Sequence, residues 1–466
     1  MKIKLYIACS VALSAPAIAQ EIPPSQNVFF EKTPQIQPEL LLNQPSINTP
    51  SVAPLAEGSS LEENINFAIV SKDWQMLEGL LAQYHTTTNF DPILYNYGLG
   101  ALYRHQGRQK EAIALYQQLL ERQPNLHYPR FDLAMMLYED KQYADAKTQL
   151  ETAEPYLAPP LQGLVSQILS NIKRSQKWQP TLNFSYESTD NVNQASDLKE
   201  LVIGEATFIR DEESLPQDAH GISYNIGATQ EKNLKSNHYV YKNVELSGVN
   251  YWDNSDYSEL TLQADLGYRY KDIKQSWGVI TMVEQNLLGG SRYNQNYVAT
   301  LEYNRQVSDQ WQVSGSVSHL QKRYEDDDLA NYYDGYANNT AWILLYQPKP
   351  KWLVYAGADF TRDDLSDQSE SSDCQGIRGG MVFSGNEIII RSNVRYAQRD
   401  FRANNFFYNE RRKDDEYQFS TTLGHKSLNW HGFTPKLSYE YQKIDSNLPL
   451  YERSNSKIYI KIDKSF

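Results

Sequence analysis

The sequence predicts an α plus membrane-β chain, in which a short α-helical solenoid precedes a 14-stranded antiparallel transmembrane β-barrel. Three observations lead to this prediction. Apolar residues keep a helical spacing up to about Ser175, and from Trp178 onwards they alternate with polar residues. The connections between the alternating segments are long and short in turn, as in outer-membrane barrels. The final strand, Lys457 to Phe466, ends on an aromatic residue that suits the interfacial girdle of such a barrel.

The N-terminus predicts export. Lys2 and Lys4 precede a short apolar run, and Ala17-Ile18-Ala19 supplies a small-residue cleavage site. We therefore assign residues 1–19 to a signal peptide. Seven prolines interrupt residues 20–60 without any apolar periodicity, which predicts a Pro-rich, disordered linker.

Charge and cysteine content exclude two classes of protein. The formal net charge is −13, and removal of Lys2 and Lys4 with the signal peptide gives −15. Nucleic-acid-binding domains normally carry a basic patch, so we expect no nucleic-acid partner. Only Cys374 remains after cleavage, so an intramolecular disulfide scaffold is excluded.

Residues 61–175 contain an internal repeat with a period of 34 residues. Leu99, Gly100, Tyr103, Ala112 and Tyr116 recur as Leu133, Ala134, Leu137, Ala146 and Leu150, and Pro124 and Pro159 close the two units. This pattern resembles the tetratricopeptide (TPR) repeat, whose small residues let paired helices approach closely. The preceding segment, Leu61 to Tyr84, has helical spacing without the consensus and is interpreted as a degenerate capping repeat.

The TPR resemblance implies a partner-binding groove lined by the first helix of each repeat. The corresponding positions in this chain are Tyr97, Arg104, His105, Tyr128, Phe131, Met135, Tyr138 and Glu139. Four of them, Tyr128, Phe131, Met135 and Tyr138, form a stripe at helical spacing. Apolar stripes of this kind usually belong to a core. Packing of the stripe against the next helix or the barrel mouth is therefore an equal alternative.

Residues 178–466 contain fourteen segments with a period of two, each about as long as a tilted strand needs to cross a bilayer. They begin near Thr181, Ile222, Tyr239, Leu260, Trp277, Tyr297, Trp311, Tyr336, Trp352, Gln375, Ile388, Tyr417, Phe433 and Lys457. The chain is rich in tyrosine, with 34 residues, as expected for rings at a water–lipid boundary.

The connections between these segments predict the topology. The short connections include Lys271–Ser276, Gln306–Gln310, Gln347–Lys351 and Ser384–Asn386, and the long ones include Asp190–Asp218, Gln321–Gly335, Arg362–Asp373, Gln398–Asp415 and Lys443–Ser456. Only Asp253–Ser255 is short where a long loop is due. Short turns face the periplasm, and an even strand count places both ends of the barrel there. We therefore expect an outer-membrane protein with a periplasmic helical domain.

The final strand alone leaves an alternative, an amphipathic edge strand of a soluble protein. Lys464 falls on its apolar face, where a charge is tolerable only near the interface, at a cost of about 0–1 kcal/mol. A soluble β-sandwich gives no reason for the alternating loop lengths, which favour the barrel.

The sequence contains no recognisable catalytic constellation. Its eight histidines lack metal-ligand spacing, and we expect neither an enzyme nor a bound metal or cofactor. The acidic run Glu325–Asp328 lacks the alternate-oxygen spacing of a calcium loop. A divalent-cation site is the alternative for this run, and lipid-headgroup contact is the alternative for the mixed-charge run Arg411–Glu416. Both runs are interpreted as solvated external loops.

Charged residues on the predicted inward faces of the strands are candidates for a functional lumen. They are Glu259, Asp265, Arg269, Glu302, Asp359, Arg391, Arg395, Lys436 and Glu440. Ion pairs that hold the barrel interior together are the default interpretation. A polar passage or gate is the functional alternative, because lumen residues can be charged without meeting lipid.

The order of segments resembles that of the surface lipoprotein assembly modulator (Slam) family. The first strand, Leu182 to Tyr186, and the following Asp190-Asn191-Val192-Asn193 resemble the opening strand and turn of that family. The resemblance implies an outer-membrane translocator whose cargo is a lipoprotein or a secreted haem-binding protein. It also implies that the TPR domain engages cargo or a chaperone. A periplasmic chaperone, the barrel-assembly machinery and outer-membrane lipid are the other partners expected.

Two alternatives to protein translocation are an exopolysaccharide export porin and a passive diffusion porin. The first usually has a much longer TPR array, and the second requires an open, conducting lumen. For a translocator, the lumen and the lateral seam between the first and last strands are both possible routes.

Overall fold

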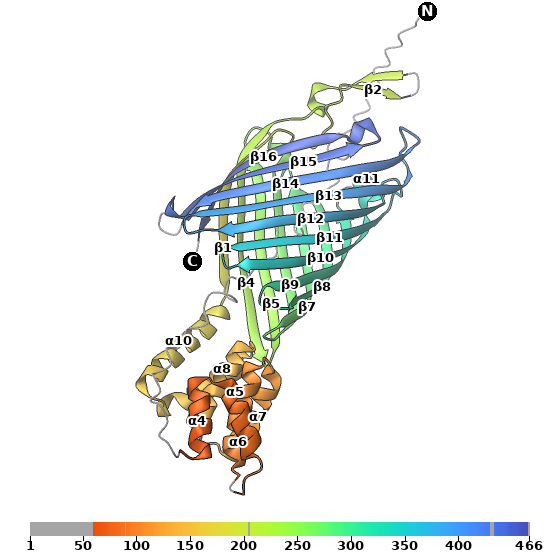
Figure 1. The fold of residues 1–466 in the computed structure, drawn as a ribbon. Coiled ribbons are helices and arrows are strands. Elements are labelled where there is room, and N and C mark those ends of the chain that lie inside the picture. Colours follow the sequence, from red (N-terminus) through yellow and green to blue (C-terminus); the bar gives the residue numbers. More distant parts are fainter. Residues whose placement is uncertain (1–58, 89, 204–205, 429–432, 465–466) are drawn as a thin grey trace, which may run out of the picture.

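The computed structural model describes residues 59–88, 90–203, 206–428 and 433–464. The predicted signal peptide, nearly all of the predicted linker and Phe466 lie outside these residues. A helical domain stands at one end of a closed barrel (Figure 1). No helix among the described residues is long and apolar enough to cross a membrane.

The described part of the helical domain contains seven α-helices, of which the first six pack as three consecutive pairs. Their bounds are α4 (Leu61–Ser71), α5 (Trp74–Tyr84), α6 (Pro92–His105), α7 (Gln109–Arg122), α8 (His127–Glu139), α9 (Tyr143–Ala153) and α10 (Pro159–Ser175). Local signals start the helices. Ser60 and Glu63 form a reciprocal capping box at α4, and Asp91 caps α6 immediately before Pro92.

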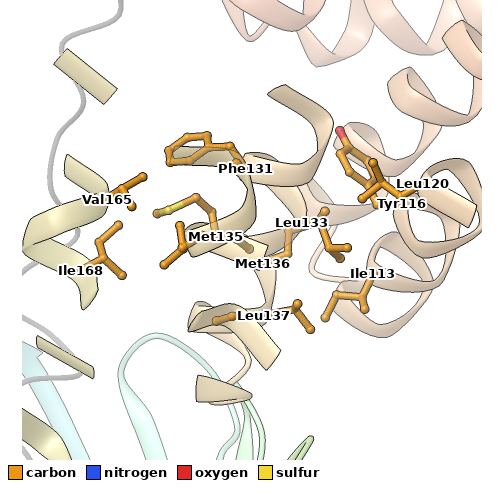
Figure 2. Packing of buried hydrophobic residues seen from close by; sticks show 14 of the residues in the cluster. Ile113, Tyr116, Leu120, Phe131, Leu133, Met135, Met136, Leu137, Val165 and Ile168 are labelled. Carbon is orange, nitrogen blue, oxygen red and sulfur yellow. The ribbon is translucent and has the colours of Figure 1, made fainter. Parts of the chain in front are cut away.

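Small residues let the helices of a pair approach each other. A Cβ atom added to Gly100 would lie 2.4 Å from the ring of Tyr116 in the paired helix α7. Ala112, Ala134 and Ala146 are fully buried. Figure 2 shows the apolar core that results, with side chains of α7, α8 and α10 packed together. The sequence repeat therefore encodes close helix contacts.

All fourteen predicted segments form strands of one closed barrel, which confirms the predicted fold class. Successive barrel strands pair antiparallel, and β1 pairs with both β4 and β16. The barrel strands are β1 (Gln179–Thr189), β4 (Ala219–Lys235), β5 (His238–Tyr251), β6 (Glu259–Lys271), β7 (Gln275–Leu288), β8 (Ser291–Gln306), β9 (Trp311–Tyr324), β10 (Gly335–Lys349), β11 (Trp352–Leu365), β12 (Ser372–Ser384), β13 (Ile388–Asn404), β14 (Arg411–His425), β15 (Phe433–Ser446) and β16 (Arg453–Lys464).

The strands expose apolar side chains on the outer face of the barrel. Leu266, Val283 and Ile377 are 58%, 51% and 64% exposed. Residues of the opposite parity carry the polar and charged side chains, many of them buried. This arrangement suits a cylinder whose outside is solvated by lipid.

The connections largely follow the predicted alternation, with additions. The first external loop carries a hairpin of β2 (Glu200–Ile203) and β3 (Ala206–Ile209), and the acidic loop carries the short helix α11 (Asp327–Tyr333). Gly289 and Gly290, both with positive φ, join β7 to β8 in a tight turn at the external end. The prediction that only Asp253–Ser255 breaks the alternation is therefore wrong.

The interpretation of Arg411–Glu416 as a loop is also wrong. β13 continues to Asn404 and β14 begins at Arg411, so this charged run is part of a strand. Arg412, Asp414 and Glu416 are buried on the inward face. The run resembles a loop in the sequence because a strand with a charged inner face lacks the apolar content of an ordinary strand.

Candidate functional site: the helical face and the barrel interior

Two polar pairs join α6 to α8, the first helices of successive repeats. The Tyr97 hydroxyl donates to Asp132 Oδ2 at 2.9 Å, and Arg104 forms an ion pair with Glu139. Both pairs connect residues 35 apart in sequence. Gln109 Nε2 also donates to Glu139 Oε2 at 3.1 Å. Sequence reasoning missed Asp132 and Gln109, although Asp132 lies one helical turn before the predicted Met135 on the same helix.

Burial controls the ionisation of this cluster. It raises the pKa of Asp132 to about 6, although the Tyr97 hydroxyl and the Arg104 charge both favour the carboxylate. Burial, together with the Asp132 charge, also raises the pKa of Tyr97. Burial lowers the pKa of Arg104, but the Glu139 carboxylate outweighs this effect and the net pKa is raised. Asp132 is thus the group whose charge changes in mildly acidic solution.

The predicted aromatic stripe is divided between the core and the surface. Phe131 and Met135 are only 6% and 7% exposed and face Val165 and Ile168 of α10 (Figure 2). Tyr128, at the start of α8, is 52% exposed. Helix α10 therefore covers the middle of the stripe, as in the alternative in which the stripe packs against the next helix.

The two remaining aromatic positions of the predicted groove also contact other rings. His105 stacks on Trp74 with the ring centroids 4.8 Å apart. Tyr138 lies 5.4 Å from Tyr143 at the start of α9. Tyr128 and the Arg104–Glu139 pair are thus the more exposed parts of the predicted groove. The Tyr97 ring packs against the apolar core, with its centroid 5.5 Å from that of Tyr116.

The nine predicted lumen residues all lie on strand faces opposite the exposed apolar side chains. Four of them form two ion pairs: Arg269 Nε lies 2.5 Å from Glu302 Oε1, and Arg395 Nη2 lies 2.6 Å from Asp359 Oδ2. Arg269 also pairs with Glu231 of β4 at 3.1 Å. Each of these ion pairs joins two strands that flank a third one: β6 and β8, β4 and β6, and β11 and β13.

The other five lumen residues lie at different positions along the lengths of their strands. Asp265 accepts from Gln263 Nε2 at 2.8 Å, and Glu440 accepts from the Tyr459 hydroxyl at 2.9 Å. Glu259 lies within electrostatic range of Lys457 and Glu187, Lys436 lies beside Gly424, and Arg391 is exposed toward the short-turn end.

A larger ion-pair network surrounds Arg395 and Asp359. It spans strands β9 and β11 to β14 and adds Lys322, Asp363, Arg378, Arg399 and Glu416. Arg399 pairs with two carboxylates, because its Nε lies 2.6 Å from Glu416 Oε1 and its Nη1 lies 3.2 Å from Asp363 Oδ2. Several of these residues share the inward parity of Arg395 but were missed where they fell inside segments interpreted as loops.

Loops fold over the network at the external end of the barrel. Leu448 and Tyr451, between β15 and β16, are 1% and 4% exposed. The Tyr451 hydroxyl accepts from Asn405 Nδ2 at 2.6 Å, and the Arg412 guanidinium lies 3.8 Å from the Tyr451 ring centroid. Within the described residues, loops and charges bury one another at the external mouth of the barrel.

The Asp-Asn-Val-Asn turn fastens the external end of the seam between β1 and β16. Asp190 Oδ1 accepts from the Ser456 amide at 2.7 Å, and Asn191 Nδ2 donates to the Ser454 carbonyl at 2.8 Å. Asn191 also closes its own turn through two hydrogen bonds of 2.8 Å with Ala195. The motif therefore joins the first strand to the last.

These features define a class of protein: an outer-membrane β-barrel with a charged interior and a TPR-like helical domain at its short-turn, periplasmic end. The chain belongs to the surface lipoprotein assembly modifier family, whose barrel matches residues 178–466 and whose N-terminal TPR repeats match residues 55–150.

Individual relatives are similar along most of their length. A surface lipoprotein assembly modifier of Pasteurella multocida is 26% identical, covering 95% of this chain and 90% of the relative. A hemophilin secretion modulator of Acinetobacter baumannii is 24% identical, covering 87% of each. Among solved structures, a Pseudomonas aeruginosa FadL homologue aligns with 62% of this chain and 90% of its own, at 10% identity and a TM-score of 0.37.

Proposed function

We propose that this protein is an outer-membrane translocator that delivers specific lipoproteins, or soluble haem-binding proteins, from the periplasm to the cell surface or the medium. The observation that carries the proposal is family membership along both the helical domain and the barrel. Relatives named for surface lipoprotein assembly and for hemophilin secretion support the two kinds of cargo. The role is one of transport, without a catalytic step.

The helical domain is proposed to engage cargo or a periplasmic chaperone. The partly exposed Arg104–Glu139 pair and the exposed Tyr128 offer charged groups and an aromatic surface to a polypeptide. Aromatic and arginine side chains are the types that most often anchor protein interfaces. The barrel-assembly machinery would insert the strands, and lipid would cover the apolar outer face.

The buried charges support translocation over passive diffusion. A diffusion porin needs a water-filled passage, whereas Arg395, Asp359 and Glu416 are less than 10% exposed inside this barrel. Loops that bury Leu448 and Tyr451 add to the closure. A translocator is expected to keep its lumen closed when no cargo is passing. A permanently open 14-stranded barrel would let solutes leak across the outer membrane.

Comparison of surface and secreted proteins from cells with and without this protein tests the proposal. Intact cells would be labelled with a membrane-impermeant reagent, and the labelled and released proteins compared by mass spectrometry. We expect one or two proteins to disappear from the surface or medium and to accumulate in the periplasm. Unchanged surface and secreted proteomes would refute protein translocation and favour polysaccharide export or passive diffusion.

A further inference from the structure

The helical domain and the barrel meet at a compact polar interface. On the helical side it consists of the α8–α9 turn, the first residues of α9, and Lys110 of α7, whose Nζ lies 3.4 Å from Asp272 Oδ2. On the barrel side it consists of two short turns, Ser236–Asn237 between β4 and β5 and Asp272–Lys274 between β6 and β7. Figure 1 shows helix α8 directly below the ends of β4 and β5.

Asp140 is the centre of this interface and has no solvent exposure. Its Oδ1 accepts from the Ile273 amide at 3.1 Å, and its Oδ2 accepts from Gln142 Nε2 at 2.8 Å. Asn237 Nδ2 donates to the Asp140 carbonyl at 2.7 Å and to Oδ2 at 3.2 Å. The same amide donates to the Lys271 carbonyl at 2.7 Å. One residue of the helical domain thus holds both barrel turns.

The barrel also caps helix α9. No side chain within the helical domain caps the N-terminus of α9, yet the Ala144 amide donates to Asn233 Oδ1 of β4 at 2.8 Å. One residue further, Asp145 Oδ2 accepts from the Ser236 amide at 2.9 Å. Free amides at a helix N-terminus need such partners. The fold of α9 is therefore completed only when the barrel is in place.

Burial makes this interface specific. Asn233 and Asn237 are 3% and 6% exposed. Buried polar groups are costly when unpaired, so a fully hydrogen-bonded set such as this one favours a single relative orientation of the two parts. The connection to the barrel is also short, since only residues 176–178 separate α10 from β1.

We infer that Asp140 and Asn237 are positioning residues that hold the TPR domain as a fixed platform under β4 to β7, and that export requires this fixed orientation. The inference rests on the proposed function. A cargo segment bound to a fixed platform is kept at a high local concentration beside the periplasmic end of β1. A domain swinging on its linker would present the segment in many unproductive positions.

Paired alanine substitution tests the inference. Asp140→Ala with Asn237→Ala should lower cargo at the surface at least about tenfold, because the local concentration of bound cargo falls when the orientation is lost. The matched control is Lys147→Ala with Glu151→Ala, which removes an exposed ion pair from helix α9, the helix that follows Asp140, and should leave export unchanged. Outer-membrane abundance and heat-modifiable migration of each variant confirm that the barrel is assembled.

A covalent link distinguishes positioning from a merely structural role. In a Cys374→Ser background, a disulfide is introduced between Asp145→Cys and Ser236→Cys, at a contact where the Asp145 side chain already reaches the Ser236 amide. Formation of this bond should restore export to the Asp140→Ala, Asn237→Ala variant, and reduction should abolish the rescue. Wild-type export from the unlinked double variant, or loss of export when the otherwise wild-type chain is linked, would overturn the inference. If complete deletion of the protein leaves export unchanged, the proposed function itself fails.

Discussion

The helical domain and the barrel bury opposite kinds of side chain. Leu77 and Leu150 are fully buried among helices, whereas Glu284 is 1% exposed and Asp414 3% exposed inside the barrel. Conversely, the barrel exposes Leu266 at its midheight. Each part follows the same physical rule in a different solvent. Water drives apolar groups into the helical core, and lipid leaves the barrel interior as the place where charges can pair.

The exposed fraction of a side chain therefore does not by itself show whether that side chain is unfavourably placed. An exposed leucine on the barrel is matched to its solvent, and a buried arginine is satisfied by its partners. The same type of substitution should therefore have opposite consequences in the two parts of the chain.

Loss of a buried barrel charge should have the largest effect. Arg399→Ala breaks two buried ion pairs, with Glu416 and with Asp363, and these carboxylates keep Arg395 and Lys322 as partners. Breaking a buried pair costs at most about 3–5 kcal/mol. Arg402→Ala on the same strand removes only partly exposed pairs, worth about 0–1 kcal/mol. Urea unfolding of the purified protein would measure the free energy of unfolding of both variants, with heat-modifiable migration on a gel as the readout of the folded fraction. Equal unfolding midpoints for the two variants would contradict the importance of the network.

A charge placed on the lipid face should have the next largest effect. Leu266→Arg on β6 should destabilise the protein in a bilayer by about 2–4 kcal/mol. Val70→Arg, at an exposed apolar position of α4, should change stability by no more than about 0.5 kcal/mol. Unfolding in lipid vesicles measures the difference. A tolerated arginine at position 266 would show that this face does not contact lipid.

The helical repeat should be sensitive to added volume. Gly100→Ala places a Cβ atom 2.4 Å from the Tyr116 ring, and overpacking of this kind costs about 1–3 kcal/mol. Gly79→Ala is the matched control, because nothing lies within 4 Å of the added atom on α5. Thermal unfolding followed by helical circular dichroism compares them. A Gly100→Ala variant as stable as Gly79→Ala would mean that α6 and α7 do not pack this closely at Gly100 and Tyr116.

The pH dependence of the stability of the helical domain should depend on Asp132. Because burial raises the pKa of Asp132 to about 6, the folded state binds a proton more tightly than the unfolded state. This contribution to stability is complete below the unfolded pKa, near 3.9, and is lost as pH rises through about 6. Asp132→Asn should flatten this part of the stability curve between pH 4 and pH 7. Unchanged curvature in the variant would show that another group titrates there.

Periodicity was sufficient to predict the fold. Alternation identified all fourteen barrel strands, because a strand between lipid and lumen must change polarity at every residue. It failed at Arg411–Glu416, where charge obscured a strand, and at Gly289-Gly290, where a tight turn replaces an external loop. Such local departures from the alternating pattern depend on where each of two neighbouring strands ends, which the sequence of one strand does not determine.

The candidate site was less predictable than the fold. The parity of Arg395 and Asp359 placed both inside the barrel, but their pairing required knowledge of which strands are neighbours. The contact between Asp140 and Asn237 joins residues 97 apart, from elements with unrelated periods. Likewise, the covering of Phe131 by α10 depends on tertiary packing. Position on a helix or strand can be predicted from spacing, whereas such partners cannot.

Closure of the barrel by its own charges is tested most directly by electrical recording. The purified full chain would be inserted into a planar lipid bilayer and compared with the Arg395→Ala, Arg399→Ala double variant. We predict no steady conductance for the wild-type chain and recurrent conducting steps for the variant, because loss of the guanidinium groups loosens the external mouth. Stable, open steps from the wild-type chain would contradict a closed translocator and indicate a passive diffusion channel.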